Sequence, residues 1–456
     1  MLKRLTSLLL SILFCVMTAL PVMAETSPVS TYSNSYLVAD AYTGDVLFSK
    51  SADTKFEPAS CTKILTALVV LEKCAAPGSG LTLDSQTTVS HNAVWSIDRG
   101  SSHIALQEGE VVTIRELLYG LLVASANDCA VALAEAVSGS VENFCTLMNS
   151  RAKELGALNT NFVNPHGLHA ENHMTTAADL AKIMQACLQN EDFVTIQSSN
   201  YYAVGPTNKS SKAHTFSSVY RMIKGGKYYD SRVVCGKSGY TTEAGNSLVT
   251  YGVSGDMGVI VVTMNSASEK NAYADTEKLM DYAFDNYHLQ KLNIPEVVNM
   301  DTAMGKFTAA VVQKPFVKYT GSNGSITSQN GVNTYALLPA GISADSLRYE
   351  AVMDTAFVEI KTGDIIGALC FYSDDVLVAH KLLMATSDPV LPEEQAPQKK
   401  GLWAAIGAFL WAAVKVFFIV LFILVVLVLC IRTYNIQKRK KRRKVRLEQM
   451  RRQRRD

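Results

Sequence analysis

The chain has 456 residues, 48% of them hydrophobic, and carries 43 Lys and Arg against 41 Asp and Glu. This length exceeds what a single hydrophobic core normally serves, so it predicts two or three structural units. Twelve of the basic residues lie in 438–456, which excludes a protein whose whole surface is built to bind nucleic acid, and we expect no nucleic-acid partner.

The two ends of the chain predict export and a membrane anchor. Residues 1–24 combine two basic residues, an apolar run and a small-residue end, which is typical of a secretory signal peptide cleaved after Ala24. Residues 402–431 are apolar and long enough for a transmembrane helix, which needs roughly 20 residues. The basic tail 432–456 should then stay in the cytoplasm, in contact with anionic lipid, and leave the preceding chain outside a single-pass membrane protein.

Between these ends, residues 25–289 predict one unit of strands and helices. Strands at both ends of the unit, with helices between them, indicate that the first and last strands share one sheet. Thr176 and Asp179 are a plausible capping pair for one helix. The expected strands are a pair within 33–56, then 247–254 and 257–265, and the expected helices are 59–73, 113–137, 141–157, 175–189 and 274–289.

The remaining segments differ from this unit in residue pattern and composition. Residues 290–387 show short strands and turns, which predict a small all-β domain. Residues 388–401 are rich in proline and polar residues and are expected to form a stiff linker. The cysteines between the signal and the membrane segment show no metal or redox spacing, so most are expected to be small buried hydrophobic residues.

A serine and a lysine three residues apart precede the first long apolar run, in EPASCTKIL. On a helix such residues share a face, so Ser60 and Lys63 are expected to lie side by side. A buried lysine of lowered pKa can take the proton of a serine hydroxyl and so make a nucleophile of it. The same spacing recurs at Ser150 and Lys153, inside a charged helix, where a solvated surface pair is the sufficient interpretation.

Two further polar motifs follow along the chain. Ser125 and Asn127, in LLVASANDCAV, interrupt two apolar runs, and a hydroxyl and an amide there can face a nucleophile. Lys237, Ser238 and Gly239, in VVCGKSGYTTEAG, place a cation and a hydroxyl on an expected strand edge, where glycine allows a substrate backbone to approach. A second Lys-hydroxyl-Gly sequence, Lys-Thr-Gly at 361–363, lies in the expected all-β domain. It is interpreted as a hairpin turn without a catalytic role.

Together and in this order, the three motifs resemble those of the penicillin-recognising serine enzymes. The chain is similar, from about 35 to 285, to the low-molecular-mass penicillin-binding proteins, the D-alanyl-D-alanine carboxypeptidases. The resemblance implies an α+β architecture: a β-lactamase/transpeptidase-like catalytic domain, with an antiparallel sheet and a helical cluster, followed by a small all-β domain and one C-terminal transmembrane helix. It implies removal of the terminal D-alanine from peptidoglycan stem pentapeptides through an acyl-enzyme, and acylation by β-lactam antibiotics.

The resemblance also assigns roles to individual residues. It implies an oxyanion hole made by the backbone N–H groups of Ser60 and Tyr240. The chain departs from the family pattern at two places. Residue 238 is a serine instead of the commoner threonine, a change that keeps the hydroxyl. The family's carboxylate-binding arginine has no counterpart in 265–279, where Lys270 is the only cation near the start of the segment. The expected catalytic residues are Ser60, Lys63 and Ser125, and the expected substrate-binding residues are Asn127, Lys237, Ser238, Gly239, Tyr240 and Thr241.

No metal and no organic cofactor is expected. His166, His169 and His173 lie close in sequence, but the family has this loop without a metal. One alternative is a class A-like β-lactamase, because Glu154 precedes Leu158 and Asn159, although with one residue more than that class has. Another is a catalytically silent, membrane-anchored wall-binding protein.

Overall fold

The structure is a computed structural model, and it describes residues 28–302, 304–312, 316–320, 325–329, 334–353 and 359–390. The expected signal peptide and transmembrane segment lie outside these residues, as do the basic tail and most of the linker. Within the described part of the chain, no helix is both long and apolar enough to span a bilayer.

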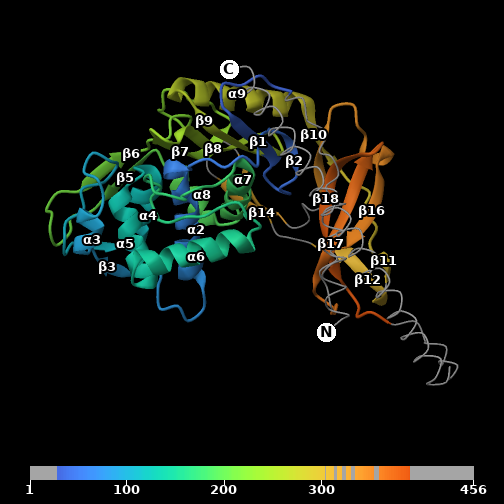
Figure 1. The fold of residues 1–456 in the computed structure, drawn as a ribbon, viewed down its shortest axis with the longest axis horizontal. Helices are drawn as coiled ribbons and strands as arrows, with labels where there is room; N and C mark the ends of the chain where they lie inside the picture. The colour runs from blue at the N-terminus through green and yellow to red at the C-terminus, as the bar shows by residue number, and fades with distance from the viewer. Residues whose placement is uncertain are drawn as a thin grey trace, which may run out of the picture. The chain divides into compact units, whose positions relative to one another are not determined.

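A five-stranded antiparallel sheet forms the centre of the first unit, in the order β2-β1-β9-β8-β7 (Figure 1). The first strand of the chain therefore pairs with the last strand of this unit, which confirms the expectation that both ends share one sheet. β7 is an edge strand. The strands are β1 Ser35–Asp40, β2 Val46–Lys50, β7 Val233–Thr241, β8 Gly245–Ser254 and β9 Met257–Ser266.

Alternate residues of β1 belong to two different hydrophobic cores, as the twofold period of a strand requires. Leu37 and Ala39 pack into the core of the helical cluster. Tyr36 and Val38 pack on the other face, with residues of the long helix α9 (Glu269–Asn286). The unit thus has three layers, with α9 on one face of the sheet and the helical cluster on the other (Figure 1).

Side-chain hydrogen bonds cap the N-termini of helices in the cluster. Thr113 and Glu116 form a reciprocal capping box at α4. The Thr176 hydroxyl accepts a hydrogen bond from the Asp179 N–H, which confirms the predicted cap of α7. The elements are α2 Lys63–Ala75, α3 His91–Trp95, α4 Ile114–Val123, α5 Asn127–Ser138, α6 Val141–Glu154, α7 Ala177–Cys187 and α8 Glu191–Gln197, with the short strand pairs β3 Gln86–Thr88 and β4 Val111–Thr113, and β5 Tyr201–Val204 and β6 His214–Ser217.

The last helix of the first unit, α9, lies nearer the N-terminus than the sequence predicts, because it begins at Glu269 rather than at 274. It ends at Asn286 rather than near 289, because residues Tyr287–Lys291 form strand β10 and pair with β15. That pairing joins segments distant in sequence and overrides the helical pattern. Beyond it, the described chain holds strands and one short 3-10 helix, as the all-β prediction requires. The further strands are β11 Val298–Thr302, β12 Gly305–Val311, β13 Phe316–Thr320, β14 Ser325–Gln329, β15 Tyr335–Pro339, β16 Arg348–Met353, β17 Ile365–Ser373 and β18 Val376–Ala385.

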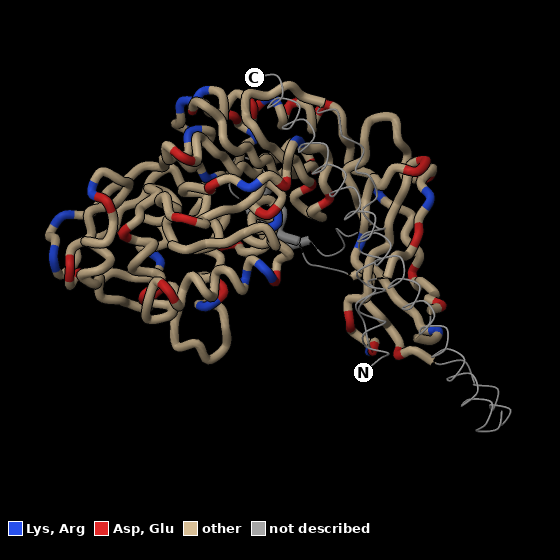
Figure 2. The backbone as a smooth tube through the Cα atoms, viewed as in Figure 1, with Lys and Arg blue, Asp and Glu red and all other residues tan. Residues whose placement is uncertain are grey.

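The seven cysteines of the described residues form no disulfide with one another, and six of them are buried. Acidic and basic residues are interspersed along the described backbone (Figure 2). The second Lys-hydroxyl-Gly sequence, Lys-Thr-Gly at 361–363, forms an exposed turn before β17. The Thr362 hydroxyl there donates a hydrogen bond to Asp388 Oδ1 at 2.7 Å.

Candidate active site

The first motif spans the junction of a 3-10 turn, Ala59–Thr62, and the α-helix α2 that begins at Lys63. In a 3-10 turn residues i and i+3 eclipse one another, so the junction brings the side chains of Ser60 and Lys63 together. Lys63 Nζ lies 2.9 Å from Ser60 Oγ and donates a hydrogen bond to the backbone carbonyl of His166 at 2.6 Å. Ala59, just before the serine, has φ 46°, a strained conformation of the kind found at functional sites.

The lysine of this pair is fully buried, with no exposed surface. Burial, and then the positive charge of Lys237, lower the pKa of Lys63 well below its usual value. Both effects disfavour the ammonium form. A neutral amine can keep its hydrogen bond to the His166 carbonyl and direct its lone pair at the serine hydroxyl, which is the geometry that a general base needs.

The second motif lies in the break between α4 and α5, which divides the single helix expected over 113–137 into two. Ser125 adopts φ 58°, so the chain turns sharply there and the serine hydroxyl meets the third motif. Asn127 begins α5, and its amide nitrogen donates to Ser101 Oγ at 2.9 Å. The buried Asn127 Oδ1 has no hydrogen-bond partner among the described residues. A buried acceptor left open in this way suits an N–H donor of a bound ligand.

The third motif lies on the edge strand β7. Lys237 Nζ donates to Ser125 Oγ at 2.9 Å and to the Ser238 carbonyl at 2.8 Å. Burial lowers the pKa of Lys237 to about 8. A Cβ atom at Gly239 would stand 2.7 Å from the Pro58 carbonyl oxygen and 2.9 Å from the Ser60 nitrogen, so only glycine lets this strand pass so close to the nucleophile.

The loop between α6 and α7 packs against the turn that carries the nucleophile and forms hydrogen bonds with it. Gly167 has φ +87°, and any side chain there would overlap the Ala59 carbonyl oxygen. The His173 ring lies 2.8 Å from the Thr62 hydroxyl through Nε2 and accepts a hydrogen bond from the Val163 N–H through Nδ1. His166 contributes its carbonyl to Lys63, as described above. His173 therefore holds the turn by hydrogen bonding.

Cys61, the residue directly after the nucleophile, is buried. It has no exposed surface, and its Sγ lies 3.7 Å from the carbonyl oxygens of Lys237 and Ser247. Burial raises the pKa of this thiol to about 11. It therefore behaves as a small packing residue beneath the site.

A cavity of about 570 Å³ opens over these groups. Its lining includes Ser60, Ser125, Ser238, Gly239 and Tyr240 of the sequence-predicted residues. Asn127, Lys63 and Lys237 are buried and do not line it, although both lysines bond to serines that do. Thr241, at the end of β7, does not line the cavity, and its hydroxyl accepts a hydrogen bond from the Ala244 N–H.

Sequence reasoning missed two charged residues that line this cavity. Arg221 and Glu269 form an ion pair there, with 3.2 Å between Arg221 Nε and Glu269 Oε1. Arg221 lies in an irregular segment before β7 and Glu269 at the start of α9, so only the tertiary structure brings them to the site. Arg221 thus adds a cation to the lining of the cleft.

Comparison with known proteins identifies the family. A family model described as D-alanyl-D-alanine carboxypeptidase matches residues 22–268. This chain belongs to that family. The D-alanyl-D-alanine carboxypeptidase DacF of Bacillus subtilis is 30% identical over 366 residues, which cover 80% of this chain and 87% of DacF. The DacC enzyme of Escherichia coli is 33% identical over 261 residues, covering 56% of this chain and 62% of DacC.

Solved structures show the same fold. Penicillin-binding protein 5 from Haemophilus influenzae superposes with a TM-score of 0.59 at 23% identity, over 80% of this chain and 99% of that one. The Streptomyces K15 DD-transpeptidase superposes with a TM-score of 0.52 at 29% identity, over 56% of this chain and 98% of that one. The expected transpeptidase-like arrangement of helices and sheet is therefore confirmed for the catalytic unit.

Proposed function

We propose that the chain is a serine-type D-alanyl-D-alanine carboxypeptidase that trims peptidoglycan stem peptides and is acylated by β-lactams. The observation that carries this proposal is the pair of Ser60, which lines the cavity, and the buried Lys63, 2.9 Å apart, with the pKa of the lysine lowered by burial and by Lys237. Family membership supplies the substrate class, and the geometry supplies the nucleophile and its base.

The reaction proceeds in two steps. Lys63 takes the hydroxyl proton as Ser60 Oγ bonds to the carbonyl carbon of the penultimate D-alanine, and the C–N bond breaks. D-Alanine leaves with a proton that reaches its amine through Lys63 and Ser125. Water then adds to the ester, and Ser60 is released with its proton. The N–H groups of Ser60 and Tyr240 stabilise the oxyanion in both steps.

Substrate binding uses the groups on the opposite side of the cleft. Lys237, with Ser238 beside it, pairs with the terminal carboxylate that the dipeptide and penicillin share. The open Asn127 Oδ1 accepts an N–H of the substrate backbone. Gly239 keeps the edge strand free of a side chain where the substrate backbone lies.

A class A-like β-lactamase is disfavoured by the position of Glu154. This residue ends α6, where its carboxylate lies 3.1 Å from Arg151 Nη1, and it does not line the cavity over Ser60. It is therefore not placed to activate a deacylating water at that serine. A silent wall-binding protein is disfavoured because the serine, the base and the carboxylate-binding lysine are all present, with Lys63 in contact with Ser60 and Lys237 in contact with Ser125.

The test uses the purified full-length protein in detergent. It is incubated with a stem pentapeptide, and the products are weighed by mass spectrometry. A carboxypeptidase releases D-alanine and leaves the tetrapeptide, and a fluorescent penicillin labels the protein covalently. An enzyme that hydrolyses penicillin rapidly and leaves the pentapeptide intact is a β-lactamase, and a protein that does neither is the silent alternative.

We further propose a topology for the whole chain. The composition of 1–24 and 402–431 supports export of the catalytic domain and a single C-terminal membrane helix, with 432–456 inside against anionic lipid. Protease added to wall-stripped cells should remove the catalytic part and spare an epitope in the tail. Digestion of the tail together with the catalytic part would contradict this topology.

A further inference from the structure

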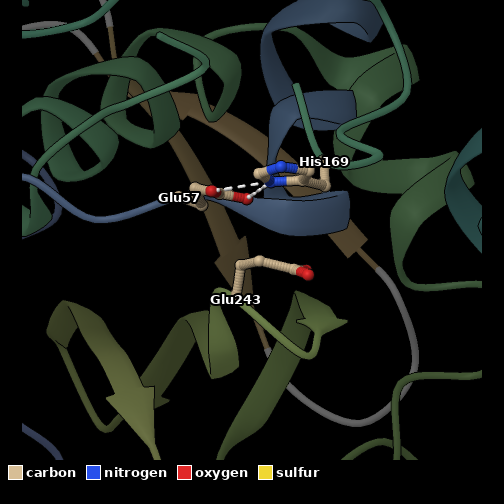
Figure 3. Close-up of side chains that lie close together, drawn as sticks. All are labelled: Glu57, His169 and Glu243. Carbon is tan, nitrogen blue, oxygen red and sulfur yellow. Dashed lines mark hydrogen bonds and ion pairs between the residues drawn. The ribbon is translucent and has the colours of Figure 1, made fainter. Parts of the chain in front are cut away.

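We propose that Glu57, His169 and Glu243 bind one divalent transition-metal cation of the zinc class, beside the nucleophile turn. One ligand atom from each lies within 4.8 Å of the others (Figure 3). The three histidines that cluster in the sequence do not form this set. It uses only His169 of them, together with two carboxylates from outside the loop.

The donor set fits such an ion. One imidazole and two carboxylates are ligands that Zn²⁺ and Co²⁺ accept, and three protein ligands leave a position for water. His169 Nδ1 lies 2.9 and 3.1 Å from the two carboxylate oxygens of Glu57. A cation bound by both residues would replace this hydrogen bond. Among the described residues, Glu57 forms an ion pair with His169, and neither Glu57 nor Glu243 is paired with a lysine or arginine that would compete with a bound cation.

The three ligands stand on backbone that is already fixed, which lowers the entropic cost of binding. Glu57 follows an antiparallel bridge, His169 follows a hydrogen-bonded turn, and Glu243 lies in the tight turn between β7 and β8. The Glu57 side chain is only 16% exposed, whereas that of His169 is 55% exposed, so the site is backed by protein and open on one side. The bonds that fix these segments join Phe56 with Thr175 (2.9 Å), Asn164 with Leu168 (2.9 Å) and Ala244 with Thr241 (3.0 Å).

The ion would join three segments that carry the catalytic groups. Glu57 leads into the turn of Ser60, His169 follows the loop whose carbonyl holds Lys63, and Glu243 closes the hairpin of Lys237. A bound cation therefore cross-links these segments and stabilises the folded domain by mass action. Its role is structural, and the proposal does not depend on the peptidase activity.

The experiment uses the full-length protein in detergent, without a histidine tag and stripped with a chelator. Co²⁺ is titrated in and followed by its visible absorption, Zn²⁺ is used to displace it, and thermal unfolding is measured with and without Zn²⁺. We expect one saturable Co²⁺ per chain, no thiolate charge-transfer absorption, and a Zn²⁺-dependent rise of several degrees in Tm. Glu243→Gln and His169→Asn should each weaken Co²⁺ binding at least tenfold.

A matched control is available in another exposed histidine–carboxylate pair. His91 Nδ1 lies 2.8 Å from Glu108 Oε2, but no third ligand completes a set there among the described residues. His91→Asn should therefore bind Co²⁺ like the wild type. Circular dichroism in metal-free buffer verifies that the ligand variants fold. Wild-type Co²⁺ affinity in folded Glu243→Gln and His169→Asn, a thiolate band, or the lack of saturable binding by the wild type would overturn the proposal.

Discussion

The ammonium group of Lys237 lies 2.9 Å from the hydroxyl of Ser125, although 112 residues separate them in the chain. This contact joins the second and third motifs, because it ties the edge strand β7 to the break between α4 and α5. Each lysine of the site is thus paired with a serine, Lys63 with Ser60 and Lys237 with Ser125. The site consists of two lysine–serine pairs, each with a buried lysine and a serine that lines the same cleft.

Replacing the nucleophile tests the first pair. Ser60→Ala should abolish labelling by fluorescent penicillin and reduce D-alanine release by a factor on the order of 10⁶, since no other group there can form the ester. Ser150→Ala removes the serine of the second Ser-x-x-Lys sequence, on α6, and should label like the wild type. Stoichiometric labelling of the Ser60→Ala protein would refute the assignment.

The two Lys-hydroxyl-Gly sequences can be set against each other. Lys237→Ala removes the buried cation expected to pair with the substrate carboxylate, a contact of roughly 1.5–3 kcal/mol, so kcat/KM should fall about tenfold to a hundredfold. Lys361→Ala, in an exposed turn, should change the free energy of unfolding by no more than about 0.5 kcal/mol and leave penicillin acylation unchanged. The reverse pattern would place the third motif at 361–363.

The pH dependence of acylation should be bell-shaped. Lys63 must be neutral to accept the serine proton, so kcat/KM falls as the pH drops through its lowered pKa. Lys237 must be charged to bind the carboxylate, so kcat/KM falls again above its pKa of about 8. Lys237→Arg keeps its charge at high pH and should lose the alkaline limb. An unchanged alkaline limb in an active Lys237→Arg protein would show that another group titrates there.

Arg221 can be tested as the second cation of the cleft. Arg221→Ala should raise KM for the stem pentapeptide about threefold to fivefold with kcat little changed, as expected of a half-exposed charge worth up to ~1 kcal/mol. Arg348→Ala is a matched control, because its side chain is 55% exposed and that of Arg221 is 53% exposed. Equal KM values for wild type and Arg221→Ala would exclude a binding role.

Gly167→Ala should damage the site through the backbone. Its new methyl group would overlap the Ala59 carbonyl oxygen in a conformation that already disfavours a side chain, so we expect a loss of at least about 3 kcal/mol in unfolding free energy and much slower acylation. Gly156→Ala has a similar φ of +75° but open space around it, and should cost only about 1 kcal/mol. Similar unfolding midpoints for the two variants would contradict the packing argument.

The sequence predicts most of the catalytic unit, because its strands and helices carry strong periodicity and its caps are local. The end of α9 is mispredicted, since β10 gains its partner β15 from a segment far along the chain. Ser60 and Lys63 could be paired from spacing alone, whereas their meeting with Ser125 and Lys237 followed only from the family resemblance. Arg221 and Glu269 carry no local signal, because their ion pair joins two elements distant in sequence.

The thiol next to the nucleophile has a practical consequence. Cys61 is inaccessible and weakly acidic, and five of the other six cysteines in the described residues are also buried. Alkylating reagents at neutral pH should therefore spare these six buried cysteines in the native protein and modify them only when it opens, whereas the half-buried Cys74 can react earlier. Pulsed alkylation followed by mass spectrometry would then read out unfolding site by site, with Cys61 reporting the opening of the catalytic centre itself.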